Sequence, residues 1–216
     1  MDRDLPALVS LRNPQLLGRL LRTCAARTAQ LTNISELAQT LQTTPETAST
    51  YLDLLERVFL VSRLPAFSRN LTARIAKHPK LHITDSGLAT SLTNLSDEHL
   101  ARSPIFGAML ESFVVSELRK QIDCSSTRLT MSHYRDRDGH EVDIVLEDEH
   151  GRIVAIEVKA AVSVGPDDIA GLRYLADRLG DDFVHGFVLY TGQGSVGIEG
   201  DRFTATPVSS LWAEFQ

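Results

Sequence analysis

Three charged side chains, two carboxylates and an ammonium, have types and spacing that could bring them together in a catalytic site. Asp143 precedes one apolar run, and Glu157 and Lys159 lie at the end of the next. Side chains of a strand alternate between its two faces, so Glu157 and Lys159 point the same way. If the two runs form a hairpin about His150, Asp143 comes opposite that end of the second strand. The two carboxylates and the ammonium then form either a catalytic site or the solvated face of a sheet.

The elements around this hairpin predict an α/β (α+β) fold on a mixed sheet. A helix with an apolar stripe is expected over 105–121, and it carries Glu111 at the edge of the stripe. A carboxylate at that place is costly unless it is paired or functional. The other expected elements are a strand at 129–135, the hairpin at 141–159, a helix at 166–179, and strands at 182–190 and 204–208. The polar segment 96–104 predicts a boundary, which gives two domains, 1–100 and 101–216.

The first hundred residues have the pattern of a helix-turn-helix unit with a wing. Apolar spacing and start signals predict helices at 13–29, 35–41 and 45–60, with Val58 or Phe59 as the last residue on the inner face of the third. Two strands at 60–67 and 80–84 follow, and Asp85 caps a further helix. This order predicts a winged helix-turn-helix domain.

The stretch from Val61 to Lys80 contains five basic residues and no acidic one: Arg63, Arg69, Arg74, Lys77 and Lys80. Such a patch is typical of contact with nucleic-acid phosphates. The exposed face of the third helix carries Glu46, Asp53 and Glu56, which would repel DNA there. Non-specific DNA contact, a purely structural winged helix and a loop that holds a partner domain therefore all stay open. A transcription regulator is a third, separate interpretation.

Composition narrows the class of protein. The chain has 216 residues, 43% of them hydrophobic, and a net charge of −6, which excludes a globally basic nucleic-acid coat. No apolar run has the length of a membrane span, and the two cysteines lack metal spacing, which favours reduced thiols in a cytoplasmic protein. Gly192–Gly197 matches G-x-G-x-x-G, but no helix is expected after it, so a dinucleotide site is not predicted. A phosphate-binding loop is missing from the sequence, so the chain alone is not an ATPase.

A helix acid, an Asp at one strand and Glu-x-Lys on the next resemble the PD-(D/E)XK nuclease superfamily. The resemblance implies that Glu111, Asp143, Glu157 and Lys159 are catalytic. It also implies that Asp143, Glu157, the Val158 carbonyl and Glu111 bind one or two Mg²⁺ or Mn²⁺ ions. The metal would polarise the phosphodiester and activate water, and Lys159 would stabilise the developing charge.

Most of residues 13–192 also resembles the C-terminal domain that follows the ATPase module in a large family of bacterial and archaeal AAA+ proteins. The sequence segments on which this resemblance rests are ISELAQTL, TASTYLDLLERVFLVSRLPAFSRNL, PKLHITDSGLATSL, GAMLESFVVSELRK, HYRDRDGHEVDIVLE, IVAIEVKA and FVLYTG. The family implies a winged helix followed by a restriction-endonuclease-like sandwich. The ATPase module is absent here, and Met1–Leu5 resembles the point where such proteins leave it. The chain is therefore expected to be a stand-alone version or a truncated copy.

Two functions follow as hypotheses. The first is a magnesium-dependent DNA endonuclease with a winged-helix accessory domain. The alternative is a catalytically inactive DNA- or protein-binding module that works with a separate AAA+ ATPase or another protein. No membrane partner is expected, and homo-oligomer formation is open.

Overall fold

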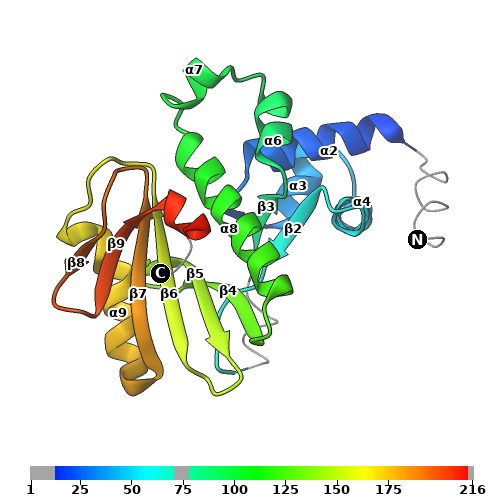
Figure 1. Ribbon diagram of the computed structural model, residues 1–216. Coiled ribbons are helices and arrows are strands. Elements are labelled where there is room, and N and C mark those ends of the chain that lie inside the picture. Colours follow the sequence, from blue (N-terminus) through cyan, green and yellow to red (C-terminus); the bar gives the residue numbers. More distant parts are fainter. Residues whose placement is uncertain (1–12, 71–77, 214–216) are drawn as a thin grey trace. The chain divides into compact units, whose positions relative to one another are not determined.

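A computed structural model describes residues 13–70 and 78–213 (Figure 1). These residues form two compact units. The first contains 13–64 and 78–112, and the second contains 65–70 and 113–213. The boundary between the units therefore lies inside a helix, between residues 112 and 113, and residues 65–70 belong to the second unit although they precede part of the first. The sequence predicted a single boundary near residue 100.

The first unit is a small three-stranded sheet with helices. Its elements are α2 (Pro14–Ala26), β1 (Gln30–Leu31), α3 (Ile34–Leu41), α4 (Pro45–Arg57), β2 (Val61–Leu64), β3 (Lys80–Ile83), α6 (Ser86–Thr93), α7 (Asp97–Leu100) and the first part of α8 (Phe106–Cys124). The strand order is β1-β3-β2, and both pairings are antiparallel.

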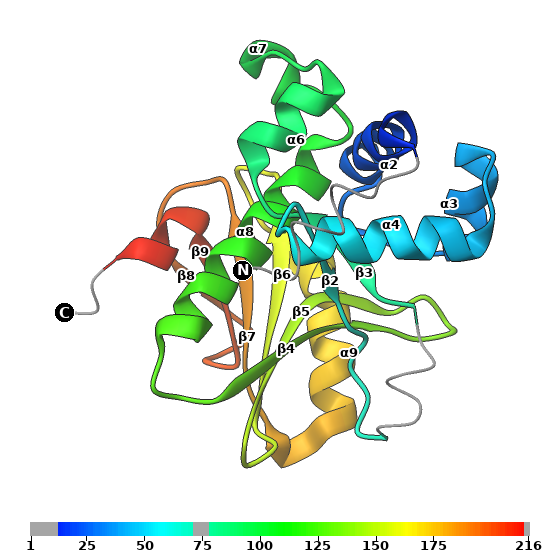
Figure 2. The same ribbon diagram turned by 90° about the vertical axis from the view of Figure 1, so that its right-hand side faces the viewer.

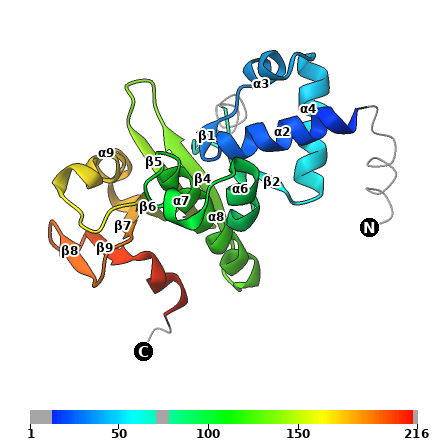
Figure 3. The ribbon, with the colours of Figure 1, turned by 90° about the horizontal axis from the view of Figure 1, so that it is seen from above.

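Side-chain caps lie at the starts of α2 and α4. The Asn13 side chain accepts the Leu16 N–H at 3.0 Å, and Thr44 accepts the Thr47 N–H at 3.2 Å. In both cases proline occupies the first helical position, where its missing N–H costs nothing. Figure 3 shows α2, α3 and α4 grouped together. Their shared core includes Leu20, Leu37, Leu52, Leu55 and Ile83.

The end of α4 differs from the prediction. The helix stops at Arg57, and Phe59 adopts a left-handed conformation with φ of 60°. Phe59 is 82% exposed and does not face the core, whereas Val58, the other residue predicted for this place, is half-buried. The helical repeat placed Phe59 inward only as long as the helix continued, and it ends two residues earlier.

The second unit is built on a six-stranded mixed sheet, which confirms the predicted α/β class. Its elements are the rest of α8, β4 (Leu129–Arg135), β5 (Glu141–Asp148), β6 (Ile153–Lys159), the 3₁₀ turn Pro166–Ile169, α9 (Ala170–Leu179), the 3₁₀ turn Gly180–Asp182, β7 (Phe183–Tyr190), β8 (Val196–Ile198), β9 (Phe203–Pro207) and the 3₁₀ turn Val208–Trp212. The order is β4-β5-β6-β7-β9-β8. β6–β7 and β7–β9 are parallel, and the other pairs are antiparallel.

Helices lie on both faces of this sheet. Figures 1 and 2 show α9 on one face and the second part of α8 on the other. Leu172 and Leu175 of α9 are fully buried against the sheet, and each such side chain contributes about 1.5–3 kcal/mol. On the α8 side, the ring of Phe113 lies 5.7 Å from that of Trp212.

The segment after β2 leaves the first unit and pairs with the outer edge of β4. The Phe67 N–H donates to the His133 carbonyl at 2.6 Å, and the His133 N–H donates to the Pro65 carbonyl at 2.9 Å. The strand expected over 60–67 is therefore split, because β2 ends at Leu64 and the next residues belong to the second unit.

Helix α9 approaches β5 so closely that only glycine fits between them. A Cβ on Gly171 would lie 2.0 Å from the Glu141 carbonyl oxygen. We expect Gly171→Ala to lower the free energy of unfolding by about 1–3 kcal/mol, since a backbone must move. Gly18→Ala is the matched control. Its nearest neighbour would be 3.9 Å away, so this change in a helix interior should stabilise by about 0.5–1 kcal/mol. Urea unfolding measures both, and a Gly171→Ala protein as stable as the native one would contradict the close approach.

Candidate functional site

The hairpin around which the site is predicted has the expected register. β5 and β6 pair from Glu147↔Ile153 to Ile144↔Ile156. Beyond the last pair, side chains replace the backbone ladder. The Asp143 N–H donates to Glu157 Oε2 at 3.1 Å, and the Val158 N–H donates to Asp143 Oδ2 at 3.0 Å. Asp143 and Glu157 therefore converge where the two strands stop pairing.

Lys159 joins this pair of carboxylates. Its ammonium lies 3.5 Å from Glu157 Oε1 and 3.9 Å from Asp168 Oδ1. The side chains of Glu157 and Lys159 are 12% and 31% exposed, so the site is partly desolvated but reachable. Of the four residues predicted to be catalytic, the second unit thus brings together Asp143, Glu157 and Lys159.

Asp168 was not among the predicted site residues. Its second oxygen accepts the Gly165 N–H at 2.8 Å, which holds the carboxylate in the turn that leads into α9. The sequence signal was ambiguous, because an acidic residue just after Gly165-Pro166 is already explained by the start of a helix. Only the return of the chain from β6 to α9 places Asp168 beside Lys159.

The fourth predicted catalytic residue, Glu111, lies in the first unit. Its Oε1 accepts a hydrogen bond from Lys80 Nζ at 2.9 Å, and both residues are buried, with exposures of 9% and 2%. Next to it, Ser112 Oγ lies 2.7 Å from Thr28 Oγ1 and 3.0 Å from His82 Nδ1. The charge beside the apolar stripe of α8 is thus compensated by a lysine of β3 within a buried polar network.

The described members of the predicted basic patch are each paired with a carboxylate. Arg63 lies 2.6 Å from Asp53 and 3.1 Å from Glu56. Arg69 lies 2.6 Å from Asp182, and Lys80 is buried with Glu111. Arg74 and Lys77 lie outside the described residues. Among 13–70 and 78–213, the predicted patch therefore contributes no cluster of unneutralised charge.

A second group of potential ligand atoms lies at the turn after β4. The ligand atoms of Asp136, Asp138 and His140 lie within 4.8 Å of one another. Asp136 Oδ1 accepts the backbone N–H groups of Asp138 and His140, and Oδ2 lies 3.0 Å from His140 Nδ1. Burial alone would raise the pKa of Asp136, but hydrogen bonds from His140 and Tyr174 outweigh it and lower the pKa to about 2. These internal bonds account for the arrangement as a stabilised turn.

The glycine-rich motif is a packing feature. The Tyr190 hydroxyl donates to the carbonyls of Gln193 and Gly194 at 3.0 and 2.8 Å. A Cβ on Gly192 would lie 2.3 Å from the Tyr190 ring. The second half of the motif is strand β8, where the sequence indicated only a loop, and no helix follows within 192–207. The motif therefore lacks the helix N-terminus that a pyrophosphate needs.

Neither Cys24 nor Cys124 forms a disulfide, and burial raises the pKa of the Cys24 thiol to about 12. None of the described helices combines the length and apolar character needed to cross a bilayer.

Comparison with known proteins identifies two domains. Residues 1–99 match the family model "Domain of unknown function (DUF8612)", and residues 106–211 match "Domain of unknown function (DUF4143)". Two mycobacterial proteins are also similar to this chain. The chain is similar to "Uncharacterized protein Rv2008c" of Mycobacterium tuberculosis and "Uncharacterized protein Mb2031c" of Mycobacterium bovis, each 31% identical over 161 residues. The alignment covers 74% of this chain but only 35% of each relative, so the chain spans about a third of their length.

The buried pair of Lys80 and Glu111 allows a direct test of what Glu111 does. Lys80→Met leaves a buried carboxylate without its ammonium, and we expect it to lower the free energy of unfolding by about 3–5 kcal/mol. Glu111→Met should cost a similar amount. The double variant Lys80→Met/Glu111→Met should recover most of the loss, because it buries no uncompensated charge. Urea unfolding of the three variants measures this, and additive losses in the double variant would refute the pairing.

Proposed function

We propose that this protein is a metal-dependent DNA endonuclease of the PD-(D/E)XK type, with its site at the end of the β5–β6 ladder. The observation that carries the proposal is the convergence of Asp143, Glu157 and Lys159 where the strands stop pairing. Two carboxylates that can bind a divalent cation, beside an ammonium, are the side chains that such chemistry uses. The partly exposed position leaves room for a phosphodiester to approach.

The residues fit a magnesium or manganese ion. Asp143 and Glu157 would hold it through carboxylate oxygens, with the Val158 carbonyl as a further ligand. The bound ion would supply Lewis-acid polarisation of the phosphodiester and a lower pKa for the attacking water. Lys159 would place its ammonium on the developing negative charge. Contacts with Glu157 on one side and Asp168 on the other hold that ammonium in position.

The surroundings support the same class. A long helix precedes the sheet, and β6 continues into a parallel pairing with β7 through Lys159↔Tyr190 after its antiparallel partner has ended. This is the arrangement expected of a restriction-endonuclease-like sandwich. In the first unit, the order α2-β1-α3-α4-β2-β3 with an antiparallel β1-β3-β2 sheet supports a winged helix-turn-helix, which we propose as an accessory domain.

A second candidate is a catalytically inactive module that binds DNA or protein and works with a separate AAA+ ATPase. The ion pairs of Arg63, Arg69 and Lys80 favour its protein-binding form, since these side chains are paired with carboxylates of the protein and not with phosphates. Under this proposal the carboxylates at the end of the ladder only complete backbone hydrogen bonds. Metal binding and cleavage separate the two candidates.

Manganese should stabilise the native protein through Asp143. At a concentration 100 times the dissociation constant, binding should add about 2.7 kcal/mol to the free energy of unfolding. Asp143→Asn should abolish this gain, because the change removes a charged ligand. Asp138→Asn is the matched control in the other carboxylate group, and it should leave the gain intact. Thermal unfolding with and without manganese measures the effect. A gain that disappears in Asp138→Asn and persists in Asp143→Asn would move the metal site to the turn after β4.

Cleavage should require Lys159. With magnesium or manganese, the native protein is expected to cut at least one of duplex, single-stranded and branched-junction DNA. Lys159→Ala should lower the rate about 100-fold or more, since it removes a donor to the developing charge. Lys120→Ala, which changes an exposed lysine of α8, should retain full activity. Cutting that persists in Lys159→Ala would point to a contaminant or another site. Metal binding without any cleavage would favour the inactive module.

A further inference from the structure

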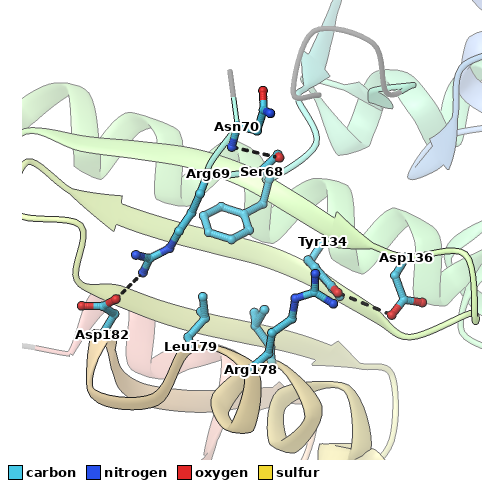
Figure 4. A pocket seen from close by; sticks show the side chains of 10 residues that line it. Ser68, Arg69, Asn70, Tyr134, Asp136, Arg178, Leu179 and Asp182 are labelled. Carbon is cyan, nitrogen blue, oxygen red and sulfur yellow. Dashed lines mark hydrogen bonds and ion pairs between the residues drawn. The ribbon is translucent and has the colours of Figure 1, made fainter. Parts of the chain in front are cut away.

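The cavity of the second unit, about 470 Å³ between the segment after β2, strand β4 and α9, has a polar lining that is already paired (Figure 4). Arg69 forms an ion pair of 2.6 Å with Asp182. Arg178 donates to the Tyr174 hydroxyl at 3.4 Å and lies in the field of the Asp136 carboxylate. The described residues that line this cavity therefore leave no charge uncompensated for a ligand.

The loop that follows β6, residues 160–165, is a segment without any charged side chain. It begins directly after Lys159 of the proposed nuclease site, and its first four residues are exposed. Val162 is 80% exposed. Single apolar residues are common on protein surfaces, so exposure alone does not assign a role to Val162. The anchoring of the loop and its place beside Lys159 distinguish this valine from others.

The loop that follows β7 holds the backbone around Val162 in place. The N–H and the hydroxyl of Thr191 both donate to the Ala161 carbonyl, at 3.1 and 2.9 Å. Gly192 permits this close approach, because a Cβ there would lie 2.4 Å from the Val162 carbonyl oxygen. Strands β6 and β7 are parallel, so both loops leave the same end of the sheet (Figure 1). The first glycine of the glycine-rich motif thus helps to present Val162 on an anchored backbone.

The residues that adjoin Lys159 differ in charge. Asp168 lies 3.9 Å from the Lys159 ammonium, and Asp167, its neighbour in sequence, is exposed. Residues 160–165 carry no charge. Carboxylates repel phosphates. A nucleic-acid strand whose phosphate reaches Lys159 is therefore expected to continue over the neutral loop and to avoid the two aspartates.

Val162 is close enough to Lys159 to contact the same strand. The two residues are three positions apart, so at most about 10 Å of chain separates them. Successive nucleotides of one stacked strand are about 3.4 Å apart along the helix axis. The nucleosides next to a phosphate at Lys159 therefore lie within reach of Val162.

We propose that Val162 contacts the sugar and base of a nucleoside next to the phosphate at Lys159, and that the strand bound there is single-stranded DNA. The inference rests on the proposed nuclease site. An exposed apolar side chain gains most by covering an unstacked base, and unpaired strands offer such bases. Duplex binding depends on lysines and arginines that neutralise many phosphates, whereas acidic residues outnumber basic ones in 65–70 and 113–213.

Fluorescence anisotropy of a labelled single-stranded oligonucleotide, with calcium in place of magnesium, measures this contact as binding. Calcium also binds through oxygen ligands. Val162→Asp should weaken binding about tenfold or more, because it places a negative charge beside the phosphates. Val162→Lys should tighten binding about threefold or more, because it adds a cation at the same place. Opposite changes in these two variants are a result that damage to the fold would not produce.

Val184→Asp and Val184→Lys are the matched controls, and both should bind like the native protein. Val184 is a valine that is 54% exposed and lies near the start of β7, whereas the loop of Val162 lies beyond the end of this strand. The native protein should bind the single strand at least about tenfold more tightly than a duplex of the same sequence. Tighter binding of the duplex would overturn the assignment of the substrate.

Lys159→Ala separates this inference from the nuclease activity. If cleavage with magnesium is lost in Lys159→Ala while the Val162 variants bind like the native protein, the Val162 contact is wrong and the nuclease site stands. If cutting persists in Lys159→Ala but the Val162 variants change binding in opposite directions, the contact stands and the nuclease site is wrong. Equal changes in the Val162 and Val184 variants would also overturn the contact.

Discussion

The end of the β5–β6 ladder is the constraint on which the candidate site depends. Backbone N–H groups near a strand end still need acceptors when they are partly buried. Here the strands separate, and the carboxylates of Asp143 and Glu157 accept the N–H groups of Val158 and Asp143. The side chains that could hold a cation are thereby oriented by the backbone itself. A carboxylate has several lone pairs, so accepting an N–H and binding a metal are compatible.

The first unit contains a buried ion pair in its interior. Two opposite charges are buried together at Lys80 and Glu111, beside a hydrogen-bonded group of Thr28, His82 and Ser112. A buried pair adds little net stability over a well-packed apolar pair, but it strongly disfavours any packing that separates its members. The pair therefore fixes how β3 and the start of α8 meet. This structural role is sufficient to explain a carboxylate at the edge of an apolar stripe.

Local rules were enough for much of the fold. Asn13-Pro14 marked one helix start and Pro45 another, and alternation in the hairpin placed Glu157 and Lys159 on one side. What the sequence could not provide depends on tertiary structure. The neighbour of Glu111 is a lysine 31 positions away, and Asp168 reaches Lys159 only through the turn before α9. Phe59 was assigned to the inner face because no local sequence signal indicates that the helix ends at Arg57.

The segment from Pro65 to Phe67 makes the two halves of the chain interdependent during synthesis and folding. The family models meet between residues 99 and 106, yet hydrogen bonds join this segment to β4 across that boundary. A fragment that begins after the boundary would leave this part of the outer edge of β4 without its partner. Bare strand edges associate with other chains, so such a fragment would tend to aggregate. On the ribosome, the segment is made first and must wait for β4, which is a long-range pairing and thus a slow one.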